Sequence, residues 1–281
     1  MSRRLRLDAE LVRRGLARSR DQAADLIAAG RVAVAGQPAG KPATQVAVDA
    51  PITVQQASDG PDYVSRGGHK LAGALAVFAS MGAESGADHT RRSGTYGLVV
   101  AGKRCLDAGA STGGFTDVLL RAGAGHVLAV DVGYGQLAWS LQTDERVTVL
   151  DRVNIRNLTP EQVAPPPELV VADLSFISLT TVLPALAACA APDADFLLMV
   201  KPQFEVGKEK AGSGVVRDPE LRAAAVASVA DAAAGVGLGV AGITASPLPG
   251  PSGNVEYFLW LRRGAGPLDN AELRQAIAAG P

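Results

Sequence analysis

From residue 65 onward the chain alternates between short apolar runs and longer amphipathic stretches, and this alternation limits the possible folds more than any other feature. Strands separated by helices connect by crossovers, which gives a mostly parallel sheet with helices on both faces. We therefore expect an α/β fold with a doubly wound sheet. The strands are predicted at 103–107, 127–131, 147–150, 168–173, 195–201, 238–245 and 255–262, and the helices at 67–80, 113–123, 178–190, 219–234 and 270–279. The polar segment 83–100 has no pattern and is predicted to be a loop.

The N-terminal 60 residues follow a different pattern, which predicts a small α+β domain. Two short helices are expected, because Asp8 and Ser19 are good N-terminal caps and a glycine follows each stretch where a helix would end. The first helix is expected to bury Leu7, Leu11 and Leu16. Strands with alternating valines follow, and a turn-rich patch ends the domain. The predicted division is a domain at 1–60, a linker at 61–64 and a second domain at 65–281.

Charge is distributed unevenly along the chain. The formal net charge is −1, but residues 1–35 contain eight arginines and four acidic residues, which leaves an excess of negative charge on the remainder. Phosphate backbones are bound by local basic patches rather than by the net charge of a protein. A solvated helix surface explains the same arginines equally well, so charge alone does not identify an RNA partner.

Composition excludes several classes of protein. A chain of 281 residues that is 47% hydrophobic can bury a sizeable core. Its two cysteines indicate no disulfide framework and fit a reducing compartment. The apolar runs are too short to span a membrane, no signal peptide is recognised, and the three scattered histidines suggest no metal site. We therefore expect a cytoplasmic protein without a metal.

A glycine-rich run, Asp107–Thr116, ends the first strand of the second domain and begins a helix. Such a loop lets the backbone approach a ligand closely, and the helix N-terminus offers free amides. A P-loop would need lysine where Phe115 stands, and a dinucleotide fingerprint would need a second glycine at Ser111. S-adenosyl-methionine remains, because its methionyl end requires no phosphate-pairing cation.

The next two strands end in residues that fit the same cofactor. Asp131 closes its strand about twenty residues after the loop, where a carboxylate can accept the hydroxyls of an adenosyl ribose. A helix cap or turn residue is the alternative for Asp131. Asn154 follows the third strand and could meet the adenine. The expected cofactor-binding residues are Asp107, Gly109, Ser111, Gly113, Gly114, Phe115, Asp131, Val132, Asn154 and Asp173.

The fourth strand ends in Asp173-Leu-Ser-Phe176, which narrows the choice of methyl acceptor. Enzymes that methylate exocyclic amines usually carry two prolines between the first and last of these four residues, and both prolines are lacking here. Methylation of a pyrimidine ring carbon normally needs a cysteine nucleophile near this loop. Cys105 and Cys189 stand elsewhere in the sequence. The acceptor is therefore expected to be neither an amine nor a ring carbon.

Three further charged residues accompany Asp173 at the predicted strand ends. Lys201 closes the apolar fifth strand and should point toward the ligand crevice, although a surface lysine would look the same. Glu256 enters the last strand, and Lys70 lies near the start of the first helix. Either of these two residues alone is more often a surface charge than a catalytic group.

In this chain order, Lys70, Asp173, Lys201 and Glu256 resemble the Lys-Asp-Lys-Glu set of FtsJ-type ribose 2′-O-methyltransferases. The spacing of the N-terminal helices and strands resembles the RNA-binding fold of ribosomal small-subunit protein four. Both together resemble the TlyA-type ribosomal RNA methyltransferases, through the runs 64–70, 107–116, 131–140, 173–178, 200–207 and 245–261.

The resemblance implies a Rossmann-like methyltransferase sheet with an antiparallel last strand, preceded by a small α+β RNA-binding domain. It implies S-adenosyl-methionine as cofactor, and 2′-O-methylation of cytidines in 16S and 23S ribosomal RNA within ribosomal subunits. It further implies increased sensitivity to capreomycin-type antibiotics. The four residues Lys70, Asp173, Lys201 and Glu256, which we call the tetrad, are catalytic in this interpretation. The protein is then a monomer that needs neither metal nor membrane. The arginines expected to bind RNA are Arg3, Arg4, Arg6, Arg14, Arg18, Arg20 and Arg66.

Two other functions are compatible with the sequence. A catalytically inert RNA-binding or ribosome-assembly factor could keep the same fold. A haemolysin is a label that this family sometimes carries, but no spanning or strongly amphipathic segment supports membrane activity.

Overall fold

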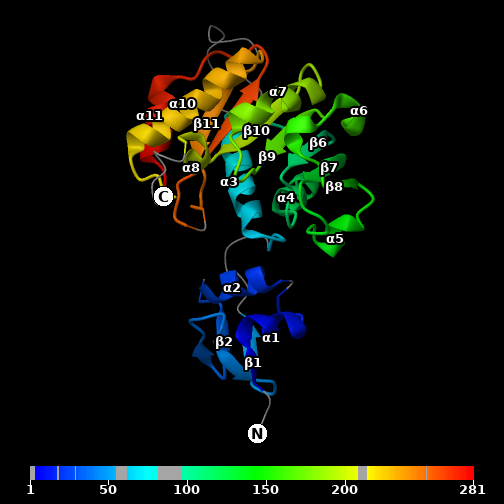
Figure 1. The fold of residues 1–281 in the computed structure, drawn as a ribbon, viewed down its shortest axis with the longest axis vertical. Coiled ribbons are helices and arrows are strands. Elements are labelled where there is room, and N and C mark those ends of the chain that lie inside the picture. Colours follow the sequence, from blue (N-terminus) through cyan, green and yellow to red (C-terminus); the bar gives the residue numbers. More distant parts are fainter. Residues whose placement is uncertain are drawn as a thin grey trace. The chain divides into compact units, whose positions relative to one another are not determined.

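The computed structural model describes residues 4–17, 19–28, 30–54, 62–81, 97–207, 214–250 and 252–281. The chain divides into two compact units, Met1–Asp62 and Tyr63–Pro281 (Figure 1). Each unit has its own hydrophobic core, so each is described by itself.

The N-terminal unit consists of two short helices and two small antiparallel sheets. One sheet pairs β1 with β4, and the other has the strand order β3-β2-β5. Its core is built from aliphatic side chains of both helices and of the strands, among them Leu7, Leu11, Ile27 and Val32. The elements are β1 (Arg4–Arg6), α1 (Leu7–Arg13), α2 (Arg20–Ala28), β2 (Val32–Val34), β3 (Gln37–Pro38), β4 (Gln45–Ala47) and β5 (Ile52–Val54).

The first helix differs from the prediction at both ends. It begins at Leu7, so Asp8 lies in its first turn and is not the N-cap residue. It ends at Arg13, ahead of Gly15, whose backbone is left-handed (φ +69°). Leu16 therefore lies beyond the helix and is 36% exposed instead of facing the core. The cap of the second helix is confirmed, because the Ser19 hydroxyl accepts a hydrogen bond from the Gln22 amide at 3.1 Å.

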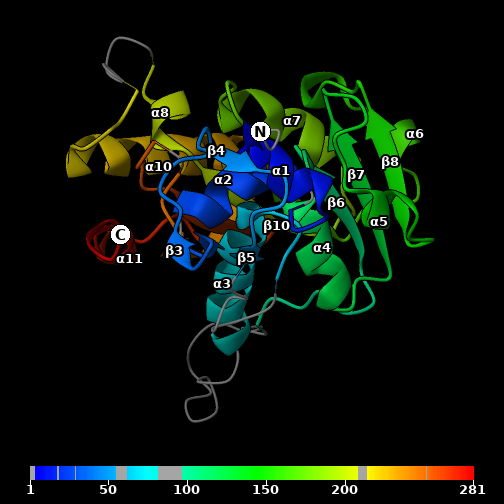
Figure 2. The same ribbon diagram turned by 90° about the horizontal axis from the view of Figure 1, so that it is seen from below.

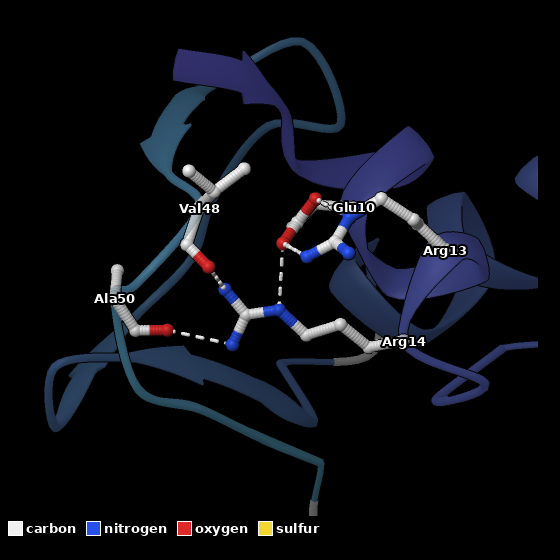
Figure 3. A network of polar contacts seen from close by, with 5 residues as sticks. All are labelled: Glu10, Arg13, Arg14, Val48 and Ala50. Atoms are coloured by element: carbon white, nitrogen blue, oxygen red, sulfur yellow. Dashed lines mark hydrogen bonds and ion pairs between the residues drawn. The ribbon is translucent and has the colours of Figure 1, made fainter. Parts of the chain in front are cut away.

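Glu10, a buried carboxylate of α1, binds two arginines, and one of them, Arg14, links the helix to the turn between β4 and β5 (Figure 3). Glu10 is fully buried, and it accepts hydrogen bonds from Arg13 at 2.6 Å and 2.7 Å and from Arg14 at 2.7 Å. The bond from Arg13, supported by Arg14, holds the pKa of Glu10 at about 2 against the opposing effect of burial. Arg14 also donates to the backbone carbonyls of Ala50 at 2.7 Å and Val48 at 2.8 Å.

The second unit contains a seven-stranded sheet with the order β11-β12-β10-β9-β6-β7-β8. Only β12 runs antiparallel to both of its neighbours, as the sequence led us to expect for the last strand. All seven predicted strands are present, with ends that differ from the prediction by one or two residues. They are β6 (Arg104–Ala108), β7 (His126–Asp131), β8 (Val147–Asp151), β9 (Leu169–Ala172), β10 (Asp195–Val200), β11 (Gly239–Ala245) and β12 (Tyr257–Arg262).

Helices cover both faces of this sheet, and Figure 2 shows the two layers. Alternate residues of a strand serve opposite faces, so Leu197 packs under one layer of helices and Leu198 under the other. On one face lie α3 (Arg66–Ser80), α4 (Gly114–Arg121) and α5 (Trp139–Gln142); on the other lie α7 (Leu179–Cys189), α10 (Pro219–Gly235) and α11 (Asn270–Ala278). Three shorter elements lie in the connections that follow strands. They are η1 (Ile155–Asn157) after β8, α6 (Pro160–Val163) before β9 and α8 (Pro202–Glu205) after β10.

The segment that was predicted to be a polar loop is partly core. Residues 82–96 lie outside the described residues, but 97–100 are described and have no helix or strand. Within them Leu98 and Val100 are only 4% and 6% exposed and join the core beneath α3. The loop prediction is confirmed for 97–100, but the burial of Leu98 and Val100 was not expected, because two apolar side chains separated by one residue can fill a core without regular pairing.

The Arg14 network generates a prediction about the stability of the N-terminal unit. Arg14→Ala should lower its free energy of unfolding by about 2–3 kcal/mol, because the substitution removes hydrogen bonds from a charged group to two carbonyls and to a buried carboxylate. Arg13→Ala is the matched control and should cost less, since Arg13 is about half exposed and, among the described residues of this unit, pairs only with Glu10. Native-state hydrogen exchange of the α1 and α2 amides in the full chain measures both losses. Equal losses in the two variants would contradict this assignment.

Candidate active site

Six of the seven strands run in the same direction and end at the same edge of the sheet, and the candidate site lies there. The connections from β6 and from β9 lead away in opposite directions, since β7 lies on one side of this strand pair and β10 on the other. In open α/β sheets, ligands bind at such a switch point, beyond the carboxyl ends of the strands. The predicted site residues on β6, β7, β9 and β10 therefore share one edge.

The loop after β6 passes so close to the end of β9 that it requires glycine. Gly109 has a left-handed backbone (φ +85°), and a Cβ atom there would lie 2.6 Å from the carbonyl oxygen of Asp173. The loop ends at Gly113, and α4 begins at Gly114. The amides of the first turn of α4 have no partner within the helix, so this end of the helix can bind a polar ligand.

Asp107 is the buried acid at the end of β6. It is 0% exposed, and its Oδ2 accepts a hydrogen bond from the Thr116 hydroxyl at 2.7 Å. Its Oδ1 is buried and has no hydrogen-bond partner. Burial raises the pKa of Asp107 to about 7, with Thr116 opposing this and the negative charge of Asp173 adding to it. An unpaired buried carboxylate oxygen at a ligand edge suits a cationic group of a ligand.

Asp131 ties the loops after β6 and β7 together. Its Oδ2 accepts a hydrogen bond from the Ser111 amide at 2.8 Å, and its Oδ1 accepts one from the Gly133 amide at 2.7 Å. Each carboxylate oxygen has a further lone pair, so the side chain can still accept hydroxyl groups. Val132, the next residue, is 71% exposed.

Asn154 lies beside this part of the edge. The Val153 amide donates to the carbonyl of Asp131 at 3.0 Å, which places the end of β8 next to the end of β7. Asn154 itself is exposed, and its Oδ1 caps η1 by accepting from the Arg156 amide at 3.0 Å. Its amide group is therefore oriented by a local hydrogen bond, with donors left for a ligand.

Phe115 has a different place from the other predicted cofactor residues. Its side chain is only 3% exposed and packs against Phe258, with 6.1 Å between the ring centroids. The side chain is thus part of the core beneath α4, and only the backbone of Phe115 belongs to the glycine-rich loop.

Lys201 and Asp173 form an ion pair at the switch point. Lys201 Nζ lies 2.6 Å from Asp173 Oδ1, and the lysine is 8% exposed. Lys201 directly follows β10 and Asp173 directly follows β9, so the register of two adjacent parallel strands brings them together. Lys201 Nζ also donates to the Ser175 hydroxyl at 2.9 Å.

Lys70 and Glu256 form a second ion pair, which is almost fully buried. Lys70 Nζ lies 2.5 Å from Glu256 Oε2, and the two side chains are 7% and 1% exposed. Lys70 comes from the second turn of α3, whereas Glu256 directly precedes β12. A charge so deeply buried needs such a partner, because an unpaired one would cost several kcal/mol.

Glycines bring α3 and this second pair beside the switch point. A Cβ atom at Gly67 would lie 3.7 Å from Asp173 Oδ2, and one at Gly68 would lie 3.1 Å from the Gly114 carbonyl. A Cβ atom at Gly114 would overlap the Ser65 hydroxyl. The first turn of α3 therefore packs directly on the start of α4 and next to Asp173.

The predicted RNA-binding arginines fall into three groups. Arg3 and Arg18 lie outside the described residues. Arg4, Arg6, Arg20 and Arg66 are exposed. Arg6 and Arg20 both donate to Asp8 Oδ2, at 2.8 Å and 2.9 Å, and so gather on one acid. Arg14 is different, because its guanidinium is engaged by Glu10 and two carbonyls and its side chain is 21% exposed.

Sequence reasoning missed three residues that the structure brings into the site. Thr116 donates to Asp107, Ser175 accepts from Lys201, and Glu205 accepts from the Ser178 hydroxyl at 2.5 Å. Ser175 could have been found, since residues two apart in an extended segment face the same side. Thr116 and Glu205 gave no such signal, because their contacts depend on tertiary packing.

Across the seven described ranges, no group of three or more His, Cys, Asp or Glu side chains is placed to hold a metal ion. Among the helices in those ranges, none is long and apolar enough to cross a membrane.

Comparisons with known proteins identify both units. Residues 63–263 match the FtsJ-like methyltransferase family, and residues 5–52 match the S4 domain. The 16S/23S rRNA (cytidine-2′-O)-methyltransferase TlyA of Mycobacterium tuberculosis is 58% identical over 100% of both chains. Hemolysin A of Brachyspira hyodysenteriae is 34% identical over 90% of this chain and 98% of its own. A solved structure of a candidate hemolysin from Streptococcus thermophilus is 34% identical, with a TM-score of 0.74, and covers 99% of this chain and 96% of its own.

A family match over most of the second unit, and a relative this similar over the whole chain, agree with the fold. The chain therefore belongs to the FtsJ-like methyltransferase family, in its TlyA branch, and carries an S4 domain ahead of its methyltransferase domain.

Proposed function

We propose that this enzyme transfers a methyl group from S-adenosyl-methionine to the ribose 2′-hydroxyl of cytidines in 16S and 23S ribosomal RNA. The observation that carries the proposal is the Lys201–Asp173 pair at the switch point, directly beside the glycine-rich loop. The relative from M. tuberculosis, whose name states this reaction, supports the choice of nucleotide and RNA.

The residues at the edge fit S-adenosyl-methionine. The unpaired Oδ1 of Asp107 suits the methionyl ammonium, and the loop 109–113 leaves room for the backbone to approach the ligand. Asp131 can accept the ribose hydroxyls through its remaining lone pairs, with Val132 and Asn154 beside the adenine. When bound, the cofactor supplies an electrophilic methyl group on a sulfonium.

The chain's own contribution to the reaction is to make a ribose hydroxyl nucleophilic. Lys201 acts in one of two ways, and Asp173 orients it in both. As an ammonium it stabilises negative charge on the 2′-oxygen, whose proton passes to water, and as a neutral amine it takes that proton itself. A cation about 4 Å from the oxygen, at an effective dielectric constant near 20, contributes about 4 kcal/mol, or about three decades in rate. Lys70 and Glu256 help to position the nucleotide next to this pair.

The N-terminal unit is the proposed RNA anchor. The exposed guanidinium groups of Arg4, Arg6 and Arg20 can contact phosphates, and Arg66 can do the same from the start of α3. Arg14, by contrast, is proposed to hold the fold of the unit. Since the proposed substrate is ribosomal RNA within ribosomal subunits, the reaction is placed in the cytoplasm. By family resemblance, the methylation is proposed to increase sensitivity to capreomycin-type antibiotics.

Replacement of Lys201 tests the proposed chemistry. Lys201→Ala should reduce kcat for methyl transfer to unmodified ribosomal subunits by about three decades, because the charge next to the 2′-oxygen is lost. Cofactor affinity should stay within a few-fold, since Lys201 acts chiefly in the transition state. Lys103→Ala is the matched control, because Lys103 forms a 2.7 Å ion pair with Asp195 at the opposite edge of the sheet. A Lys201→Ala enzyme with the kcat of the control would refute the proposed role.

The raised pKa of Asp107 predicts that cofactor binding releases a proton. Near pH 7 the buried carboxyl is partly protonated in the free enzyme, and the methionyl ammonium would favour the ionised form. Calorimetry at pH 6.5, in buffers of different ionisation enthalpy, should detect release of about half a proton or more. The release should disappear in Asp107→Asn, which should also bind the cofactor more weakly. Equal proton counts in both proteins would contradict the assignment.

The same shift has a consequence for the free enzyme. The folded state holds the Asp107 proton more tightly than the unfolded state does, because the pKa is raised in the fold. The resulting gain in folding stability is fully present below the ordinary pKa of 3.8, and it is lost as the pH rises through about 7. Asp107→Asn should therefore unfold at a higher temperature than the parent enzyme at pH 8 when no cofactor is present. Identical unfolding temperatures would show that the carboxylate is not destabilising in the fold.

A further inference from the structure

Among the described residues, Lys201 Nζ has two hydrogen-bond acceptors, and both belong to the short segment after β9. Asp173 Oδ1 lies 2.6 Å from Lys201 Nζ, and Ser175 Oγ lies 2.9 Å from it. The two acceptors are separated by one residue, so a single extended segment presents both to the same nitrogen. The family tetrad accounts for Asp173, but it assigns nothing to Ser175.

Two acceptors define the direction of the nitrogen more strictly than one. The nitrogen is tetrahedral, with one bond to Cε and three remaining positions. If only Asp173 accepted a hydrogen bond, the other two positions could rotate about the Cε–Nζ bond. With Ser175 as second acceptor that rotation stops, and one position stays free. In the charged amine this position holds the third N–H, and in the neutral amine it can hold the lone pair.

The segment that carries Ser175 is fixed at its far end by α8. Glu205 accepts hydrogen bonds from the Ser178 hydroxyl at 2.5 Å and from the Leu179 amide at 2.9 Å. The ring of Phe176 packs on that of Phe204, with 5.3 Å between centroids. Because α8 begins directly after Lys201, one short stretch of chain positions both Lys201 and its second acceptor.

The backbone of this segment is strained, which indicates that its shape is imposed. Phe176 has φ +65°, in the left-handed region that residues with a side chain rarely adopt. The Phe176 side chain itself is 91% exposed, so the contacts of this segment with α8 are those of Ser178 and Leu179 with Glu205 and of one edge of the Phe176 ring with Phe204.

We propose that Ser175 is a positioning residue for methyl transfer: its hydroxyl fixes the rotation of the Lys201 amine so that the free position faces the acceptor hydroxyl. The inference rests on the proposed role of Lys201. Since Ser175 acts through Lys201 and not through the cofactor, its removal should affect kcat and leave binding unchanged.

The test compares Ser175→Ala and Ser175→Thr with the parent enzyme, using unmodified ribosomal subunits and S-adenosyl-methionine. Ser175→Ala should lower kcat about ten- to hundredfold, with KM for both substrates within a few-fold, because a misdirected amine costs rate and not affinity. Ser175→Thr keeps the hydroxyl and should restore most of kcat. Ser80→Ala is the matched control, since Ser80 is an exposed serine of α3 whose hydroxyl also donates one hydrogen bond, to the Val77 carbonyl.

The outcomes separate this inference from the proposed function. If Ser175→Ala raises KM for the subunits while kcat is unchanged, Ser175 contacts RNA and the inference is wrong. If Ser175→Ala keeps full kcat while Lys201→Ala is inactive, only the role of Ser175 is refuted. If Lys201→Ala itself stays active, the proposed function fails as well. Thermal unfolding and cofactor binding of each variant show whether a lost kcat reflects a lost fold.

Discussion

The reversal of strand order between β6 and β9 is the constraint on which the site depends. Parallel strands end at one edge, and the chain leaves β6 and β9 in opposite directions there, which is the place where open α/β sheets bind ligands. At this edge the backbone passes very close to itself, at Gly109 beside Asp173 and at Gly68 beside Gly114. A side chain at these glycines would push the cofactor loop away from the ion pair that is proposed to act on the substrate.

Electrostatics at this edge follow from the same geometry. Carboxyl groups end β6, β7 and β9, and the lysines that accompany them come from β10 and from α3. Lys201 and Lys70 each have an acidic partner, whereas Asp107 is left with a buried unpaired oxygen and a pKa raised to about 7. Burial disfavours the negative charge of Asp107 in the free enzyme, so this position is suited to bind a positive charge. The buried carboxylate is thus unfavourable when the site is empty and favourable when a cation binds beside it.

Much of this architecture could be predicted from the sequence, because apolar runs and their order determine a doubly wound sheet. Asp173 and Lys201 could be placed at the ends of strands, and the adjacency of β9 and β10 in the structure explains why they pair. The pairing of Lys70 with Glu256 was not predictable, since the two residues are 186 positions apart and meet only when α3 packs beside β12. The contacts of Arg14 could not be predicted for a related reason: charge alone does not reveal that the carbonyls of Val48 and Ala50 engage its guanidinium.

The position of the new methyl group tests the central claim most directly, because the glycine-rich loop and Asp131 would serve any acceptor and only Lys201 with Asp173 favours a hydroxyl. Unmodified ribosomal subunits would be incubated with the enzyme and S-adenosyl-methionine carrying a tritiated methyl group. The RNA would then be hydrolysed in alkali and, separately, digested to nucleosides for mass spectrometry. The account predicts label in dinucleotides that resist alkali and in 2′-O-methylcytidine. Label on a base, in mononucleotides released by alkali, would contradict it.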